Sequence, residues 1–233
     1  MTSNAYRQRL DEIEVYFDDT AVEAWKRLTS TEPVSGIRAT VRAGRDRMRA
    51  LIAQCLPDDL GGRRILDAGC GTGAMAVELA RRGADVVAID IAKNLVDMAR
   101  ERTPADLGAG RIEFRVGDML GAAREGFDHV VAMDSLIHYA APDMVAMVEA
   151  LAEPTRGSLL FTYPPRTTAT ALMHMTGRLF PRADRAPSIE PIGPADLGRR
   201  LARSPQLGTW RAGRCERVVS GFYLSEMLEL VRR

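Results

Sequence analysis

Three glycines and two aspartates stand close together in the segment ILDAGCGTGAMAVELARRGADVVAID. Gly69, Gly71 and Gly73 fall where an apolar run gives way to a helical pattern, and glycine there permits a sharp turn and a close approach of the backbone to a ligand. Asp67 lies two residues before the first glycine, and its carboxylate suits a cationic ammonium group and would repel a pyrophosphate. Asp90, at the end of the next apolar run, could accept hydrogen bonds from both hydroxyls of a ribose.

Apolar runs that alternate with helical patterns must position these side chains. Strands are predicted over residues 64–68, 85–90, 111–116, 127–133 and 157–163, and helices over residues 74–82, 92–102 and 142–153. This alternation predicts an α/β fold with a doubly wound, mostly parallel, Rossmann-like sheet. Near-continuous apolar strands agree, because both faces of such a sheet are covered. The acidic residues then lie at the carboxyl ends of strands, where open α/β sheets bind ligands.

The start of the chain departs from this alternation and is predicted to be helical. Tyr6, Leu10, Ile13 and Phe17 recur at helical spacing. Further helices are predicted over residues 20–28 and 37–55, with a turn at 31–36. In the helix over 37–55, one side is expected to be buried: Ile37, Val41, Met48, Leu51, Ile52 and Cys55. We therefore expect an N-terminal helical lid and substrate-binding segment, residues 1–60, before a Rossmann-like catalytic domain, residues 61–233.

The last third of the chain contains a second irregular segment. Residues 178–192 are rich in proline and arginine, which predicts a lid loop. A helix is predicted over residues 194–203. Residues 208–218 and 220–230 are then expected to form an antiparallel hairpin that closes the sheet.

Composition limits the classes of function. With 233 residues, 46% hydrophobic and 27% charged, the chain suits one large globular domain. A net charge of +1 gives no sign of nucleic-acid binding. Cys55, Cys70 and Cys215 are too far apart for a zinc site or a disulfide framework and suit a reducing cytoplasm. The sequence has no recognisable signal peptide or membrane span, so we expect a soluble, cytoplasmic protein without a metal site.

The order D-x-G-x-G-x-G, helix, strand ending in Asp resembles the class I S-adenosylmethionine-dependent methyltransferases. The resemblance implies that Asp67 and the glycines hold the methionine part of the cofactor and that Asp90 holds its ribose. It also implies that Asp118 accepts from the adenine amino group, and that Asp134 and Ser135 lie beside the methyl group. The implied cofactor-binding set is Asp67, Gly69, Cys70, Gly71, Gly73, Asp90, Ile91, Asp118, Met119, Asp134 and Ser135. From the residues alone, Asp118 could equally be a helix cap, and the loop could belong to a general nucleotide-binding domain.

Segments outside the glycine loop bear on the methyl acceptor. The fourth predicted strand is followed by DSLIHY, not by the N-P-P-Y or D-P-P-Y of enzymes that methylate amides or adenine, so nucleic-acid substrates are disfavoured. Several segments resemble the magnesium-protoporphyrin IX O-methyltransferases of (bacterio)chlorophyll synthesis: YF at 16–17, AW at 24–25, IRATVRAGR at 37–45, IHY at 137–139, YPPRT at 163–167 and LFPRADRAP at 179–187. The resemblance extends along nearly the whole chain.

That resemblance implies a substrate and partners. The acceptor would be a propionate carboxylate of magnesium-protoporphyrin IX, and the product would be its monomethyl ester. The porphyrin-carrying subunit of magnesium chelatase would be the natural protein partner. Helical and basic segments beside the sheet would also allow weak, peripheral contact with a photosynthetic membrane.

Four arginines could receive such an acceptor. Arg38, Arg42, Arg45 and Arg49 are spaced by four, three and four residues, so they form one stripe on a helix. Guanidinium groups bind carboxylates well, and the stripe could hold a flat dianionic porphyrin or an acidic partner. It could instead be a solvated helix face that is partly paired with Asp46. The substrate-binding set implied by the resemblance is Arg38, Arg42, Tyr139 and Tyr163.

A carboxylate nucleophile needs little acid–base chemistry. Its pKa of about 4 leaves it ionised at neutral pH, so catalysis should consist of aligning its oxygen with the methyl group and excluding water. The family resemblance implies that His138 holds the propionate and that Tyr16 closes over the cofactor or substrate. From the residues alone, His138 could instead cap the next helix, and Tyr16 could be a packing aromatic.

Two other functions share much of this pattern. A small-molecule O-methyltransferase acting on a quinone-precursor catechol would have the same cofactor loop, but a phenol usually requires a base or a metal and has no use for the arginine stripe. A non-catalytic S-adenosylmethionine-binding accessory protein would have the same fold. The complete set of cofactor residues and the histidine beside the methyl site disfavour this alternative, and turnover to S-adenosylhomocysteine would exclude it.

Overall fold

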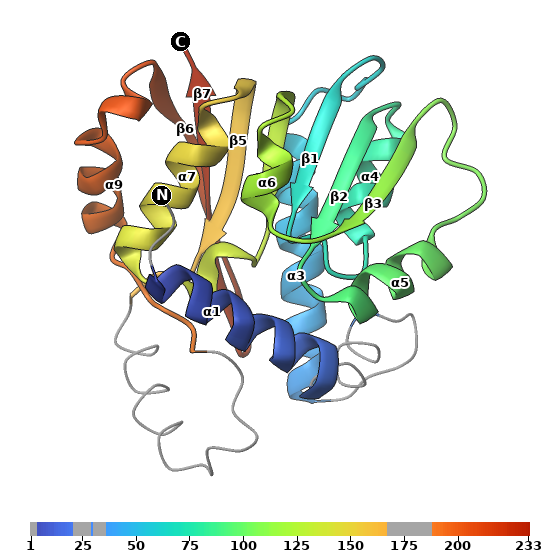
Figure 1. Cartoon of the computed structure of the whole chain (residues 1–233), viewed down its shortest axis with the longest axis horizontal. Coiled ribbons are helices and arrows are strands. Elements are labelled where there is room, and N and C mark those ends of the chain that lie inside the picture. The colour runs from blue at the N-terminus through green and yellow to red at the C-terminus, as the bar shows by residue number, and fades with distance from the viewer. Residues whose placement is uncertain (1–3, 21–28, 30–35, 167–187) are drawn as a thin grey trace.

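The computed structural model of the chain describes residues 4–20, 29, 36–166 and 188–233. The helix predicted over 20–28, the turn at 31–36 and the lid loop at 178–192 lie wholly or largely outside the described residues. Figure 1 shows the described residues as a central sheet that carries helices on both of its sides, with α1 running along one edge.

Seven strands form one mixed sheet in the order β3-β2-β1-β4-β5-β7-β6. Their bounds are β1 Arg64–Ala68, β2 Asp85–Asp90, β3 Arg111–Val116, β4 Phe127–Ala132, β5 Thr155–Tyr163, β6 Trp210–Ser220 and β7 Tyr223–Arg232. Strands β1 to β5 pair in parallel, whereas β7 is antiparallel to both β5 and β6. The predicted Rossmann-like sheet with a closing antiparallel hairpin is confirmed. Because the strand order reverses between β1 and β4, their carboxyl ends open a crevice for a ligand.

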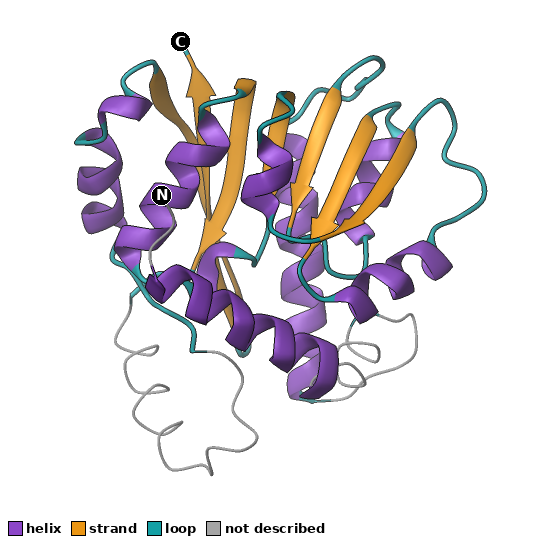
Figure 2. Ribbon diagram, viewed as in Figure 1, coloured by secondary structure: helices purple, strands orange, loops and turns teal. Residues whose placement is uncertain are grey.

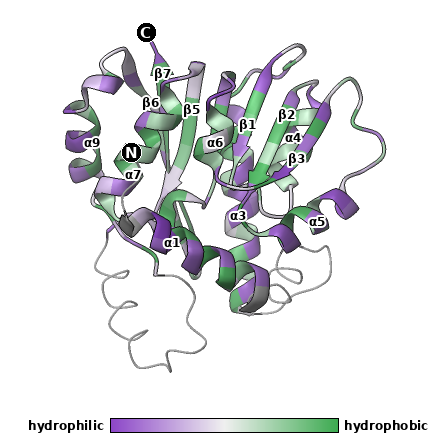
Figure 3. Cartoon of the chain, in the orientation of Figure 1, coloured by the Kyte–Doolittle hydropathy of each residue, from purple (hydrophilic) through white to green (hydrophobic). Residues whose placement is uncertain are grey.

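The buried apolar side chains form two clusters on the sheet. One cluster includes residues of α3 (Ile37–Gln54) and α4 (Ala74–Arg81), and the other includes residues of α6 (Met119–Ala123), α7 (Ala141–Ala152) and α9 (Pro194–Ala202). Helix α5 (Lys93–Arg102) packs against β2 and β3. Figure 2 shows these helices flanking the strands. In Figure 3 the strand β2 is hydrophobic along most of its length, whereas α5 and α9 carry hydrophilic stretches.

The N-terminal segment crosses the edge of the sheet at which β1, β2 and β4 end (Figure 1). It consists of α1 (Asn4–Val15) and one π-helical stretch, η1 (Tyr16–Thr20). Tyr6 and Ile13 are buried in the core cluster that contains α7, and Leu10 and Phe17 are partly buried against it. The predicted apolar face of this helix is therefore confirmed, and the segment is held over the carboxyl edge of the sheet.

Helix α3 is docked on the closing hairpin. Met48 and Ile52 are fully buried, and the Thr40 carbonyl accepts a hydrogen bond from Ser220 Oγ at 2.8 Å. The prediction that Ile37 shares this buried side is wrong, because its side chain is 56% exposed. Ile37 is the first residue of a helix whose N-terminal end projects beyond the sheet (Figure 1).

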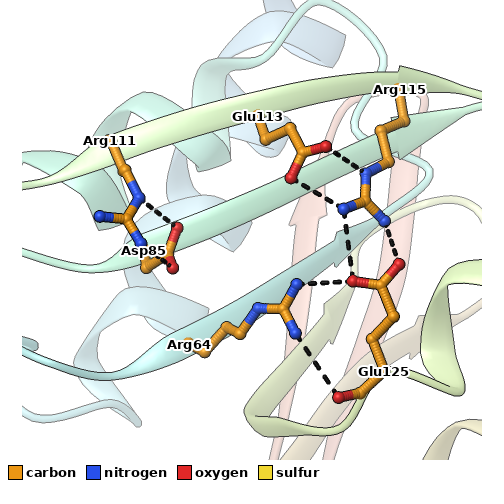
Figure 4. A network of polar contacts seen from close by, with 6 residues as sticks. All are labelled: Arg64, Asp85, Arg111, Glu113, Arg115 and Glu125. Carbon is orange, nitrogen blue, oxygen red and sulfur yellow. Dashed lines mark hydrogen bonds and ion pairs between the residues drawn. The ribbon is translucent and has the colours of Figure 1, made fainter.

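Strand β3 lies at an open edge of the sheet, and its side chains are exposed or only partly buried. The expectation that both faces of each strand are covered is therefore not met by β3. Charged side chains join it to its neighbours in a network that Figure 4 shows, made by Arg64, Asp85, Arg111, Glu113, Arg115 and Glu125. Arg115 pairs with Glu113 through two bonds of 2.8 Å and also contacts Glu125. Exposed ion pairs add little stability one by one, but charge on an edge strand opposes pairing with another chain.

Candidate active site

A cavity of about 510 Å³ opens at the carboxyl edge of the sheet. Most of the residues predicted to bind cofactor or substrate lie on its wall: Asp67, Gly69, Cys70, Gly71, Asp90, Ile91, Asp118, Met119, Asp134, Ser135, His138, Tyr139 and Arg42. Four predicted residues are not on the described wall: Tyr16, Arg38, Gly73 and Tyr163. The wall therefore joins the ends of β1, β2 and β4 to residues of α1, η1 and α3.

The glycine loop after β1 has the backbone that its sequence requires. Gly69 has φ +83°, and a Cβ atom there would lie 2.3 Å from the Cβ of Ser135. Gly71 has φ +52° with open space beside it, and its N–H donates to Asp90 Oδ2 at 2.8 Å. Gly73 caps α4 and packs near the ring of Phe114 instead of facing the cavity. The first two glycines therefore leave a backbone cradle that a ligand can approach.

Asp67 is a buried carboxylate at the base of this cradle. Its side chain is 1% exposed, and within the described residues its Oδ2 has no hydrogen-bond partner. Burial, together with the nearby charge of Asp90, raises the pKa of Asp67 to about 7. A buried acceptor without a partner is costly, and a cationic ligand group would supply the missing partner. This fits the ammonium group of S-adenosylmethionine.

Asp90 is held at the tip of β2 by backbone donors. Oδ2 accepts from the N–H of Gly71, and Oδ1 accepts from the N–H of Ala92 at 3.0 Å. Burial raises the pKa of Asp90, although these hydrogen bonds act in the opposite direction. Each carboxylate oxygen can accept more than one hydrogen bond. The arrangement thus leaves acceptor capacity for the two hydroxyls of a ribose.

Asp118 is indeed a helix cap, and it also contacts the N-terminal helix. It is the N-cap of α6, where Oδ1 accepts from the N–H of Leu120 at 2.9 Å. The same oxygen accepts from the hydroxyl of Tyr6 at 2.8 Å. The ring of Tyr6 stacks on Tyr139, with 5.4 Å between centroids. Sequence reasoning missed Tyr6 as part of the site, because nothing local links it to a residue 112 positions away.

The π-helical stretch η1 is tied to the other side of the cavity. Asp18 Oδ1 accepts from the backbone N–H of Asn94 at 2.7 Å, and the Asn94 amide donates to the Asp18 carbonyl at 2.9 Å. Phe17, not Tyr16, lines the cavity. Tyr16 packs edge-on against Phe17, with 5.0 Å between centroids, and burial raises the pKa of its hydroxyl.

His138 lies where the acceptor is expected. It ends the short helix η2 (Leu136–His138) after β4 and is largely buried on the cavity wall. Its Nδ1 is 3.4 Å from the carbonyl oxygen of Ser188, and its ring lies 5.8 Å from the ring of Phe17. His138 is three residues after Ser135, which packs against Gly69 of the glycine loop. The glycine loop and His138 therefore lie on the wall of the same cavity.

The arginines of the stripe on α3 have different partners. Arg42, Arg45 and Arg49 line the cavity. Arg49 pairs with Asp46 at 2.8 Å, which is the pairing expected of a solvated face. Arg45 instead reaches across to Asp134, with 2.9 Å between Nη1 and Oδ2.

Asp134 is surrounded by partners that the sequence analysis did not identify. Its carboxylate accepts from the hydroxyls of Tyr223 at 3.1 and 3.2 Å and of Thr162 at 3.2 Å. Its backbone N–H donates to Thr162 Oγ1 at 2.7 Å. These partners come from β5 and β7, so only the sheet order brings them to the end of β4.

Tyr163 does not take the place predicted for it. Its side chain is buried in the core, and its hydroxyl donates to Glu226 Oε1 at 2.5 Å. The two residues are direct partners in the register of β5 and β7. Burial and this hydrogen bond raise the pKa of Tyr163. The hydroxyl of Tyr163 is therefore bonded to β7, and its predicted contact with substrate stays a prediction.

The sheet order, the glycine loop after β1 and the acidic residues at the ends of β1 and β2 define a class I S-adenosylmethionine-dependent methyltransferase. Comparison with known proteins narrows the class. A family model described as magnesium-protoporphyrin IX methyltransferase C-terminus matches residues 132–232, and a methyltransferase-domain model matches residues 65–156.

Relatives with full-length similarity carry the same name. A magnesium-protoporphyrin O-methyltransferase of Rhodobacter capsulatus is 47% identical over 225 residues, which cover 96% of this chain and 97% of the relative. The crystal structure of magnesium protoporphyrin IX methyltransferase from Synechocystis PCC 6803 with bound S-adenosylhomocysteine has a TM-score of 0.80 at 27% identity, covering 95% of this chain and 98% of that chain. A ubiquinone biosynthesis O-methyltransferase of Xanthomonas oryzae pv. oryzae is 36% identical, but it covers only 53% of this chain and 54% of its own length. The chain belongs to the family of magnesium-protoporphyrin O-methyltransferases.

Proposed function

We propose that this cavity catalyses transfer of a methyl group from S-adenosyl-L-methionine to a propionate carboxylate of magnesium-protoporphyrin IX. The chain is an S-adenosylmethionine-dependent O-methyltransferase of (bacterio)chlorophyll biosynthesis. Its products are the monomethyl ester and S-adenosyl-L-homocysteine. One observation carries the proposal: the carboxylate of Asp67, whose Oδ2 has no partner within the described residues, and the arginines of α3 line one cavity. A cationic cofactor and an anionic acceptor can therefore meet there.

S-adenosylmethionine supplies a methyl group on a positively charged sulfur. Asp67 would receive its ammonium group, and Asp90 would accept from its ribose hydroxyls. Both hydrogen bonds of Asp118 fall on Oδ1, so Oδ2 is the oxygen proposed to accept from the adenine amino group. The rest of the proposed cofactor contact is made by the glycine loop and the neighbouring side chains Cys70, Ile91, Met119 and Ser135.

The reaction needs no proton transfer. An oxygen lone pair of the ionised carboxylate forms the new C–O bond while the electrons of the S–C bond return to sulfur. The protein's task is to hold the acceptor oxygen in line with the methyl group and to exclude water. His138 is proposed to hold the propionate, with Arg42 and Tyr139 beside it. Tyr16 is proposed to act with Phe17 in closing the cavity.

Some expected features stay proposals. The division between a lid of residues 1–60 and a catalytic domain of residues 61–233 is supported for residues 4–20 by α1 and η1, which cross the cavity edge, whereas α3 packs in a core cluster of the sheet. Arg38 is proposed to extend the basic wall beyond Arg42. Tyr163 is proposed to act on the substrate indirectly, through the residues that it contacts in β5 and β7.

Contact with the porphyrin-carrying chelatase subunit, or with a membrane surface, is also a proposal. It is supported by three apolar side chains that are more than half exposed near the start of α3 and the β6–β7 turn: Ile37, Val219 and Phe222. Among the helices described, none is both long enough and apolar enough to cross a bilayer.

The direct test incubates the protein with S-adenosylmethionine and magnesium-protoporphyrin IX and follows the monomethyl ester by chromatography. Metal-free protoporphyrin and a catechol serve as parallel acceptors. Ester from the magnesium porphyrin is the expected result. A methylated catechol without porphyrin ester would instead support the quinone-precursor alternative.

The proposed role of His138 has a matched control in His129, a partly buried histidine that contacts Ser158 and is not on the cavity wall. His138→Gln should lower kcat by at least about tenfold, whereas His129→Gln should leave kcat within about twofold. Tyr16→Ala is measured beside them. If His138→Gln keeps kcat within about twofold of the parent, His138 has no role in the mechanism, and the same result for Tyr16→Ala would exclude Tyr16.

A further inference from the structure

Asp134 puts a buried negative charge at the acceptor side of the cavity. It follows β4 with φ +55°, the one positive φ at a non-glycine position within the described part of the chain. Its side chain is only 6% exposed. The next residue, Ser135, lies against Gly69 of the cofactor loop, and His138 follows three positions later. Asp134 is therefore next to a residue that packs on the cofactor loop and four positions before His138, and all three residues line one cavity.

This charge poses a problem for an anionic acceptor. A buried carboxylate without compensation is unfavourable by itself. It would also repel a second carboxylate brought into the same cavity, because charges interact strongly where water is excluded. The hydroxyls of Thr162 and Tyr223 satisfy hydrogen bonds of Asp134 but leave its charge unchanged.

Arg45 provides the compensating charge. Its Nη1 lies 2.9 Å from Asp134 Oδ2, and both side chains line the cavity. The packing of α3 fixes this approach. A Cβ on Gly44 would lie 2.4 Å from the Tyr223 ring, so only glycine lets the helix come this close. Tyr223 in turn donates to the Asp134 carboxylate. One contact region therefore positions both members of the ion pair.

We propose that Arg45 determines the charge preference of the acceptor subsite by neutralising Asp134. The pair has no net charge, so a propionate can be held beside the methyl group without repulsion from the end of β4. Arg45 is in this sense a specificity-determining residue that acts through Asp134. This inference rests on the proposed function, since it assumes that the acceptor is a carboxylate.

The test measures how strongly the cavity distinguishes a charged porphyrin from a neutral one. Binding of magnesium-protoporphyrin IX, a dianion, is compared with that of its dimethyl ester, which is neutral, by fluorescence titration with S-adenosylhomocysteine present. The dianion preference is the Kd of the diester divided by the Kd of the dianion. It is determined for the parent, Arg45→Gln, Asp134→Asn and the double variant.

Charge alone predicts the order of the four proteins. Arg45→Gln leaves one negative charge and should lower the dianion preference by about tenfold. Asp134→Asn leaves one positive charge and should raise it. The double variant has no net charge at the pair and should return to within about threefold of the parent. A merely structural role would lower the preference in all variants or would leave it unchanged.

Further measurements keep the outcomes distinct. S-adenosylhomocysteine affinity should stay within about twofold in Arg45→Gln, and Arg199→Gln, on α9, serves as a distant charge control. The proposal is overturned if Arg45→Gln keeps the parental preference, if the double variant is no better than Arg45→Gln, or if the cofactor affinity of Arg45→Gln falls in parallel with its dianion preference. Should Arg45→Gln fail to fold, a dianion preference in Asp134→Asn at or below the parental value overturns the proposal. Absence of ester with the parent protein would refute the proposed function, while the binding ratios would still test the charge preference.

Discussion

The hydroxyl of Tyr6 and the carboxylate of Asp118 are 2.8 Å apart, although 112 positions of sequence separate them. Tyr6 belongs to the N-terminal helix, and Asp118 belongs to the loop proposed to receive adenine. The hydrogen bond falls on the oxygen that also caps α6. The N-terminal helix is thereby coupled to the orientation of the adenine-facing oxygen.

We expect Tyr6→Phe to weaken cofactor use more than turnover. The variant keeps the stack on Tyr139 and loses the donor to Asp118. A hydrogen bond to a carboxylate is worth about 1–3 kcal/mol. Because Tyr6 acts on the cofactor through Asp118, only part of this free energy should appear in binding, and the KM for S-adenosylmethionine should rise about three- to tenfold with kcat within about twofold. Steady-state kinetics with varied cofactor measure this.

Tyr163→Phe is the matched control, because it also removes a buried hydroxyl bonded to a carboxylate but lies outside the cavity wall. It should lower the free energy of unfolding by about 1–3 kcal/mol without changing the cofactor KM. An equal rise in KM for both variants would mean that Tyr6 acts only through stability.

Cofactor affinity should depend on pH through Asp67. Burial holds its pKa near 7 in the free enzyme, whereas the unfolded chain has a value of about 3.9. The folded state therefore keeps a proton that the unfolded state loses, and this group's contribution to stability falls as pH rises from about 4 to about 7. An ammonium ligand requires the ionised form, so affinity should rise between about pH 5.5 and 7.5.

Calorimetry in buffers of different ionisation enthalpy checks this, because binding below about pH 7 should release a proton. Asp67→Asn should weaken binding and remove the release. Proton release that persists in Asp67→Asn would assign the titration to another group, such as Asp90.

Phe17 should matter for turnover because it lines the cavity and faces the ring of His138. Phe17→Ala should lower kcat by about tenfold, since it opens the cavity to water and removes the contact that orients the imidazole. Val15→Ala is the control from the same segment, as Val15 is 58% exposed, and its kcat should not change. Single-turnover measurements separate the chemical step from product release.

Two glycine-to-alanine changes in helices should have opposite effects on stability. Gly44→Ala forces a Cβ into the ring of Tyr223 and should destabilise the protein by about 1–3 kcal/mol. Gly198 of α9 has open space at its Cβ position, so Gly198→Ala should stabilise by about 0.5–1 kcal/mol. Urea unfolding of both variants tests this, and a neutral Gly44→Ala would show that α3 can shift on β7.

Most of the fold could be predicted from local sequence patterns. The alternation of apolar runs and helices predicted β1 to β5 nearly residue by residue, and the closing hairpin was displaced by about two residues at its ends. Asp67 and Asp90 could be proposed as site residues because a position at or near a strand end is a local property, and both line the cavity. The same holds for the turn glycines.

What the sequence could not show depends on contacts between distant segments. The segment around Tyr163 resembles that of a site residue, but nothing local indicates that the register with β7 pairs Tyr163 with Glu226. The arginine stripe gave no sign that Arg45 would reach Asp134, because that contact needs the angle at which α3 packs on the hairpin. The π-helical stretch after α1 decides that Phe17, and not Tyr16, lines the cavity, and a helical periodicity cannot indicate it.

The contacts of the N-terminal segment also bear on how the protein is made. Asp18 and Tyr6 leave the ribosome long before their partners, which lie 76 and 112 residues further along the chain. At 5–20 residues per second the second delay is about 5–20 s. During that time α1 has only local contacts, and a helix of 12 residues is marginal in water. Helix α1 should therefore be synthesised well before the residues that it contacts and be among the last elements to settle, and refolding followed at Tyr6 should lag behind refolding of the sheet.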